Sequence, residues 1–256
     1  METIQTIRRH VDRTDAVIVD LDKTLIRGRV AEGLGRWYLN REWGNRNYCN
    51  VVVGIGDMVR IKAHLRKYRG TDAADAMGLA MFYSSLVRNG LGERNEMHDC
   101  AIGYFKMNEI EPVKEIVSLA SKPRFLATIA GSTAANAAVG HFILDGFTSN
   151  MDLFDSNNGK SMLSGIQILI GDGSQKLEAV ERMLRVHKIS LKNCTVIGDG
   201  LPDIPMMRSA GLSIASPLAK DEVRAVAKIH LTDSMDGIHS RTVRDANSKS
   251  NGRTYP

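Results

Sequence analysis

Short apolar runs that are rich in β-branched residues recur along the chain. The first spans residues 16–19 and ends directly on Asp20. Continuous apolar runs of this length are typical of strands that helices cover on both faces of a parallel sheet. The later runs are 125–130, 194–198, 212–215 and, more weakly, 229–231. The pattern therefore predicts a sheet whose strands are mostly buried.

Helical periodicity separates several of these runs. Residues 134–143 follow the second run, and residues 176–189 precede the third with their apolar positions on one face. This alternation of strand and helix patterns predicts an α/β fold built on a doubly wound parallel sheet. Between residues 146 and 173, two strand patterns flank an Asn-Gly dipeptide, which is a good signal for a hairpin.

Residues 27–120 interrupt the alternation. Their pattern is helical, with Gly and Asn as punctuation and one β-branched run at 51–55. We expect about four helices here, which form a helical cap inserted into a core made of residues 1–26 and 121–240. Because ligands of open α/β sheets bind at the carboxyl ends of the strands, the cap would lie over the binding site.

The composition changes this picture little. The chain has 256 residues, of which 43% are hydrophobic and 25% charged, as in ordinary soluble domains. No apolar run approaches the length of a membrane span, and the charged first 13 residues do not resemble a secretory signal. The three cysteines show no CxxC spacing, so we expect a reduced, cytoplasmic protein. The seven histidines form no metal-ligand pattern.

The net charge of +5 is unevenly distributed. Residues 241–256 carry four basic residues and one acidic residue with almost no apolar content, which predicts a disordered tail. Residues 60–69 hold five Lys or Arg and no acid. Together the two segments could bind nucleic acid, which is an alternative function of a different class. The pattern at 60–69 is also that of an amphipathic helix, and we favour a solvated face.

Two pairs of carboxylates follow predicted strands. Asp20 and Asp22 would project together, because alternate residues of a strand point the same way. Their mutual repulsion requires a cation or a proton, and Mg²⁺ takes hard oxygen ligands of this kind. The run at 194–198 also ends on a carboxylate, Asp199, and Asp203 follows four residues later. Asp199 would complete the shell of the ion, and Asp203 would support it from behind.

The segments DLDKTL, at 20–25, and GDGLPDIPMM, at 198–207, together resemble the haloacid dehalogenase superfamily of phosphohydrolases. The core is most similar to the phosphoserine-phosphatase-like branch, which has a helical cap. The resemblance implies a hydroxyl at the end of the second strand, for which Thr128 is preferred and Ser132 is the alternative. It also implies a lysine at the start of the helix before the last motif, where Lys176 is preferred to Lys160.

The resemblance further implies a mechanism. Asp20 would be the nucleophile that forms an aspartyl-phosphate, and Asp22 the general acid and base. Thr128 and Lys176 would hold the phosphoryl oxygens. The expected function is Mg²⁺-dependent hydrolysis of a small phosphorylated metabolite. A phosphotransferase or mutase that uses the same intermediate is the alternative among enzymes.

The same resemblance implies the ligands of the metal. Mg²⁺ would be bound by Asp20, by the backbone carbonyl of Asp22 and by Asp199, and Asp203 completes the set of acidic residues assigned to the ion.

One position departs from that branch and bears on the substrate. Where the branch has a Glu that meets the ammonium group of phosphoserine, this chain has Arg29, and Glu32 comes three residues later. Because an arginine cannot bind a cation, we do not expect phosphoserine as the substrate. Arg27 and Arg29 could bind a further anionic group, or they could lie in a solvated loop.

Overall fold

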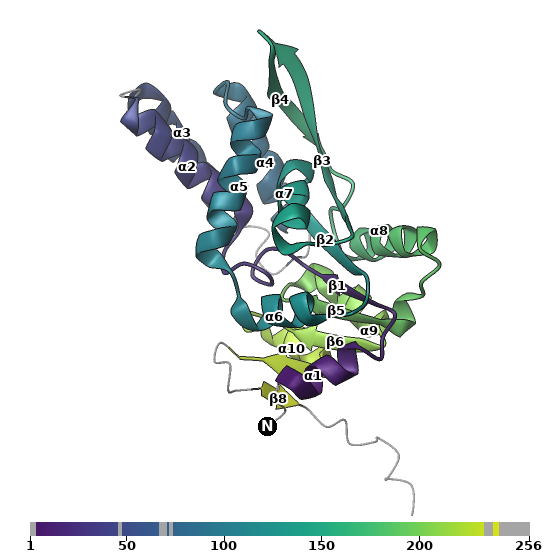
Figure 1. The fold of residues 1–256 in the computed structure, drawn as a ribbon. Helices are drawn as coiled ribbons and strands as arrows, with labels where there is room; N and C mark the ends of the chain where they lie inside the picture. Colours follow the sequence, from purple (N-terminus) through teal and green to yellow (C-terminus); the bar gives the residue numbers. More distant parts are fainter. Residues whose placement is uncertain (1–3, 46–47, 67–70, 72–73, 233–237, 241–256) are drawn as a thin grey trace, which may run out of the picture.

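The computed structural model describes residues 4–45, 48–66, 71, 74–232 and 238–240. Its centre is an eight-stranded sheet with the order β4-β3-β2-β1-β5-β6-β7-β8 (Figure 1). Strands β1, β2, β3, β5, β6 and β7 are parallel, and an antiparallel strand closes each edge. The strands are β1 Ala16–Val19, β2 Arg124–Gly131, β3 Gly146–Asn157, β4 Lys160–Gln167, β5 Cys194–Gly198, β6 Leu212–Ala215, β7 Ile229–Leu231 and β8 Ile238–Ser240.

Strand β1 shows why the apolar runs are continuous. All four of its residues are buried, and successive side chains enter different cores. Val17 and Val19 belong to one hydrophobic cluster, and Ala16 and Ile18 belong to the other. A strand covered on both faces needs apolar residues at every position.

Helices cover both faces of the sheet. The core on one face takes side chains from α1 Ile4–Val11, α6 Glu111–Leu119 and α7 Ser132–Phe142. The core on the other face takes them from α8 Gly173–Val186, α9 Ile204–Ser209 and α10 Asp221–Val226. Two short 3₁₀ turns, Leu191–Asn193 and Leu201–Asp203, flank β5. The predicted doubly wound α/β fold is confirmed.

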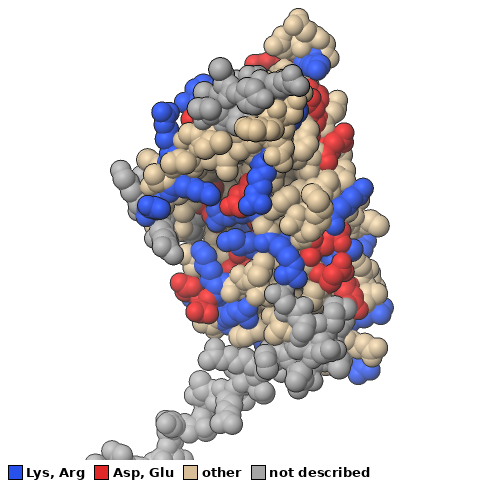
Figure 2. All heavy atoms as spheres, turned by 90° about the vertical axis from the view of Figure 1, so that its left-hand side faces the viewer, with Lys and Arg blue, Asp and Glu red and all other residues tan. Residues whose placement is uncertain are grey.

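Four helices form the body of the cap, on one end of the sheet (Figure 1). They are α2 Val30–Gly44, α3 Tyr48–Leu65, α4 Ala74–Arg88 and α5 Arg94–Asn108. A fifth helix of the inserted segment, α6, packs against α1 instead. The β-branched run at 51–55 lies within α3, so its strand propensity does not decide the local structure. Lys and Arg side chains gather on the face of the molecule that carries α2 and α3 (Figure 2).

The predicted hairpin is present, and it lies beside the cap. Strands β3 and β4 pair antiparallel, and the turn residues Asn158 and Gly159 both have positive φ, as the Asn-Gly signal requires. The hairpin packs against α4 and α5, and the N–H of Leu163 donates to the carbonyl of Gly92. The sequence analysis assigned residues 146–167 to the core segment 121–240. The local pattern of these strands does not show that they contact the cap helices.

An ion-paired cluster joins the end of the cap to the core. Glu109, directly after α5, accepts hydrogen bonds from Lys114 of α6 and His141 of α7. Burial acts to raise the pKa of Glu109, but these two hydrogen bonds outweigh it and hold the pKa below the ordinary value.

Two segments singled out from the sequence lie wholly or partly outside the described residues. They are the basic tail 241–256 and the end of the basic stretch, 67–69. Among the helices of the described ranges, none is long and apolar enough to cross a membrane.

Candidate active site

The candidate residues converge at the carboxyl ends of the central strands. Asp20 follows β1, Thr128 lies near the end of β2, and Asp199 follows β5. A cavity of about 470 Å³ lies between this edge of the sheet and the cap helices, and Asp20, Asp22, Thr128, Lys176, Asp199 and Asp203 all line it. The sheet topology thus joins residues that are up to 183 positions apart, from Asp20 to Asp203.

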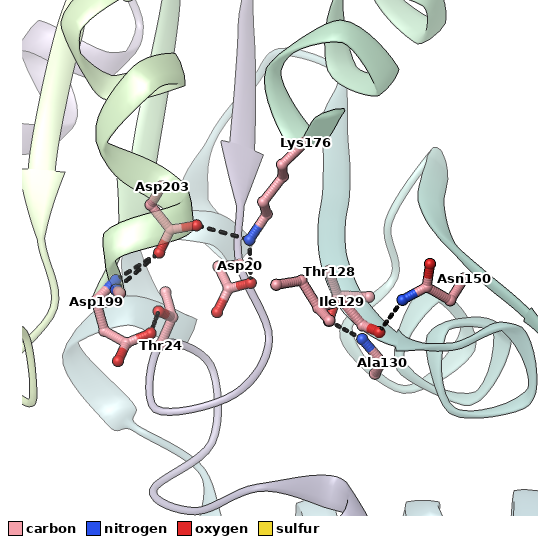
Figure 3. Close-up of polar contacts among 10 residues, drawn as sticks. Asp20, Thr24, Thr128, Ile129, Ala130, Asn150, Lys176, Asp199 and Asp203 are labelled. Atoms are coloured by element: carbon pink, nitrogen blue, oxygen red, sulfur yellow. Dashed lines mark hydrogen bonds and ion pairs between the residues drawn. The ribbon is translucent and has the colours of Figure 1, made fainter. Parts of the chain in front are cut away.

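Lys176 is the centre of the polar network (Figure 3). It projects from the first turn of α8, and only 2% of it is exposed. Its Nζ donates to Oδ1 of Asp20 and to Oδ1 of Asp203, both at 2.6 Å. An ammonium buried this deeply requires paired carboxylates, because desolvation of an unpaired charge is costly.

Asp203 is fixed from three directions. Besides the bond from Lys176, its Oδ2 accepts the backbone N–H groups of Asp199 and Gly200, both at 2.9 Å. This arrangement shapes the turn that carries Asp199. A Cβ at Gly198 would lie 2.5 Å from the Asp203 carboxylate, so the close approach requires glycine there.

The electrostatics of the site favour protons or cations. Burial raises the pKa of Asp20 to about 7, an effect that Lys176 opposes and Asp203 reinforces. Burial, with the charges of Asp20 and Asp203, raises the pKa of Asp199 well above its ordinary value. Burial acts to lower the pKa of Lys176, but Asp20 and Asp203 outweigh burial and raise the pKa above its ordinary value. The lysine therefore stays charged. One ammonium thus faces three carboxylates.

The carboxylates of this cluster fit a hard cation. Asp20, Asp199 and Asp203 each offer an oxygen, and the three oxygens lie within 4.8 Å of one another. Oxygen donors with a surplus of negative charge are what Mg²⁺ takes in proteins. The oxygens of Asp203 already accept three N–H donors, so Asp20 and Asp199 are better placed to contact an ion directly.

Asp22 lies outside that cluster and has different surroundings. Its Oδ1 accepts the N–H of Val30, at the start of α2, at 3.0 Å. Burial raises the pKa of Asp22 to about 6, against the lowering effects of that hydrogen bond and of Arg29. The carboxyl group is therefore partly protonated near neutral pH, as an acid–base group needs to be.

The alternative residues lie elsewhere. The N–H of Ala130 donates to the Thr128 hydroxyl at 3.1 Å, and Thr128 lines the cavity. Ser132 accepts the N–H of Asp152 at the start of α7 and does not line it. Lys160 is exposed at the turn of the hairpin. The structure thus brings Thr128 and Lys176 to the cavity, and neither alternative.

Arg29 lines the cavity but is already paired. Its guanidinium contacts Oδ1 of Asp75, on α4, at 2.5 Å. Glu32 is exposed at the edge of the same cavity, whereas Arg27 does not line it.

The sequence analysis missed Asn150, which is fully buried in β3. Its Nδ2 donates to the carbonyl of Ile129 at 2.7 Å (Figure 3) and to that of Ile170 at 3.2 Å. Its Oδ1 accepts the N–H groups of Leu169 and Ile170, both at 2.7 Å. Asn150 therefore ties β2, at the residue after Thr128, to the loop before α8. The sequence offers one signal for this role, a polar residue within a strand pattern. It does not show the hydrogen-bond partners, which lie 19–21 residues away.

Comparison with known proteins bears on the family and the fold. Residues 145–239 match the family of haloacid dehalogenase-like hydrolases. A substrate-bound phosphoserine phosphatase superposes with a TM-score of 0.58 at 19% identity, over 87% of this chain and 94% of that one. A haloacid dehalogenase family hydrolase from Salmonella enterica serovar Typhi gives 0.60 at 15% identity, over 85% and 67%. A phospho-aspartyl intermediate analogue of phosphoserine phosphatase gives 0.55 at 18% identity, over 86% and 93%.

No curated protein matches the sequence significantly. The family match and the structural likeness confirm the resemblance that the motifs indicated. The chain has the fold of the haloacid dehalogenase-like hydrolases and shares it with phosphoserine phosphatases over most of their length.

Proposed function

We propose that this protein is a phosphomonoester hydrolase that works through an aspartyl-phosphate on Asp20. The observation that carries the proposal is the buried contact of Lys176 with Asp20, at 2.6 Å, inside a cavity that Asp22 and Thr128 also line. A nucleophile, an acid–base group and two phosphate-binding groups thus meet at one place. The phosphoserine phosphatase captured as a phospho-aspartyl analogue, whose fold this chain shares, supports the same chemistry.

The residues divide the reaction into two steps. The Asp20 carboxylate attacks phosphorus, and the bond to the leaving oxygen breaks as Asp22 gives that oxygen its proton. Asp22, now ionised, then takes a proton from water, which attacks the phosphorus and releases inorganic phosphate and free Asp20. Lys176 favours the ionised form of Asp20 and, with the Thr128 hydroxyl, binds the phosphoryl oxygens.

The cofactor that fits the acidic cluster is Mg²⁺. Asp20 and Asp199 would hold it, with the backbone carbonyl of Asp22 as the expected third ligand and Asp203 in support. When bound, the ion would offset the repulsion between the carboxylates and the phosphate and would polarise the phosphoryl oxygens. The substrate is a small phosphorylated compound. We do not expect phosphoserine itself, because Arg29 stands where the phosphoserine-phosphatase-like branch has a Glu, and the anion beside it, Asp75, is paired with Arg29.

Hydrolysis of para-nitrophenyl phosphate tests this proposal. We expect turnover that depends on Mg²⁺, is lost in EDTA, and falls at least about a thousandfold in Asp20→Asn, because the nucleophile is gone. Asp22→Asn should also lose turnover and should accumulate protein-bound phosphate. Asp155→Asn, on the exposed face of the hairpin, is the matched control and should retain normal rates. Normal turnover in Asp20→Asn would contradict the assignment.

A further inference from the structure

The cavity is much larger than a phosphate group requires. Its volume of about 470 Å³ is within the range of sites that enclose a whole organic ligand. The carboxylates and Lys176 form its floor, and the rest extends between the cap helices α2, α3 and α4. This upper part is where the alcohol portion of a phosphomonoester would lie.

The upper part of the cavity is mostly apolar. Helices α2 and α4 contribute small residues one turn apart, Ala31 with Gly35 and Ala74 with Gly78. The side chains of Phe82 and Leu65 pack closely over the two glycines. The larger residues that line the upper part come chiefly from α3 and α4: Met58, Ile61, Leu65, Leu79 and Phe82. Such a wall offers the alcohol portion hydrophobic contacts and few polar partners.

Two of the charges that line the cavity offset each other. Arg29 and Asp75 pair with each other at 2.5 Å. A substrate ammonium would have to compete with Arg29 for Asp75, and a substrate carboxylate with Asp75 for Arg29. Lys62, on α3, and Arg66, directly after it, are exposed and line the edge of the cavity. Cations there attract the phosphate without adding a polar site deep in the cap.

We infer that the substrates of this site are phosphomonoesters with an apolar alcohol portion, such as alkyl or aryl phosphates. This inference rests on the proposed phosphatase function and adds the class of leaving group. The alcohol portion lies against Met58, Ile61 and Phe82, while the phosphate meets Lys176 and Thr128.

A series of alkyl phosphates tests the inference: ethyl, butyl, hexyl and octyl phosphate, with O-phosphoserine as the polar comparator. We expect kcat/KM to rise by up to about fourfold per methylene until the cavity is filled, from the ~0.8 kcal/mol that one buried methylene contributes. Phosphoserine should be hydrolysed more slowly than butyl phosphate. A flat series, or phosphoserine as the best substrate, would overturn the inference and leave the phosphatase function standing. No turnover of any ester with Mg²⁺, including para-nitrophenyl phosphate, would overturn both.

Two neighbouring residues of α3 provide a matched pair of variants. Met58 lines the cavity, whereas Val59 is 61% exposed and does not line it. Met58→Gln should reduce the ratio of kcat/KM for hexyl over ethyl phosphate by at least about threefold, and Val59→Gln should keep the wild-type ratio. Each ratio is measured on one preparation, so a loss of folded protein cancels. Ile61→Gln replaces Met58→Gln if the latter does not fold. If Met58→Gln or Ile61→Gln keeps the wild-type ratio, the alkyl chain of the substrate does not contact the cap.

Discussion

Replacing Lys176 with methionine tests the buried network most directly. The change keeps an unbranched side chain, one atom shorter, and removes an ammonium that lies 2.6 Å from two carboxylates, of which Asp20 is 6% and Asp203 1% exposed. Removing one partner of a buried ion pair costs about 3–5 kcal/mol, because a charge is left uncompensated. We expect a loss in this range rather than twice as much. Asp203 keeps two backbone donors, and burial already favours proton uptake by Asp20.

Urea unfolding in the presence of EDTA measures this loss without relying on enzymatic activity. Wild type and Lys176→Met should show similar slopes, with the midpoint of the variant shifted to lower urea. Lys192→Met, at an exposed position, should change the free energy of unfolding by less than about 0.5 kcal/mol. A loss below about 1 kcal/mol in Lys176→Met would refute the view that this ammonium holds the acidic cluster together.

A second substitution separates charge from packing. Asp203→Asn removes one of the unpaired carboxylates and leaves an oxygen for the N–H groups of Asp199 and Gly200. Combined with Lys176→Met, it should cost less than the sum of the two single changes, by at least about 1 kcal/mol. Additive losses would mean that Lys176 stabilises the fold by packing rather than through its charge.

Three further predictions concern the surroundings of the site. Asn150→Leu removes the side-chain partner of backbone groups in β2 and in the loop before α8 and should cost at least about 3 kcal/mol in urea unfolding; a loss below about 1 kcal/mol would contradict this. Gly131→Ala puts a Cβ 2.0 Å from Oδ1 of Asp152 and should cost about 1–3 kcal/mol, whereas Gly140→Ala meets nothing within 4 Å and should not destabilise; equal effects would argue against the clash. Because the folded-state pKa of Glu109 lies below its ordinary 4.5, the stability it contributes is present above that pH and is lost as the pH falls through the folded-state value. The stability deficit of Glu109→Gln in urea unfolding should therefore shrink from about pH 7 to about pH 3, and a constant deficit would contradict the assignment.

Local pattern was sufficient for the core of the fold. The apolar runs that end on Asp20 and Asp199 predicted buried parallel strands, since only strands covered on both faces need apolar residues throughout. The motifs at those ends also predicted which side chains would share one edge of the sheet. Lys176 could be selected over Lys160 because it begins a helix that leads into β5.

Other features depend on contacts that are distant in sequence. Helix α1 has eight residues, and its basic side chains obscure the two core residues, Ile7 and Val11, that hold it against the sheet. The role of Asn150 exists only once β3 lies between β2 and the loop before α8, which are distant in sequence. The pairing of Arg29 with Asp75, 46 residues away, is equally invisible to local pattern, and it removes Arg29 as a simple anion site.

The position of the β3–β4 hairpin has a mechanical consequence. A cap made of one inserted segment would be joined to the core by two chain crossings and could swing about them as a lid. Here β3 continues from the core sheet into a hairpin that packs on α4 and α5, so the same body is tied down at four crossings. A large rotation of α4 and α5 would have to break the hydrogen bond between Leu163 and Gly92 or bend β3. Substrate entry is therefore expected to depend on side chains and on α2 and α3 at the basic face, more than on a swinging lid.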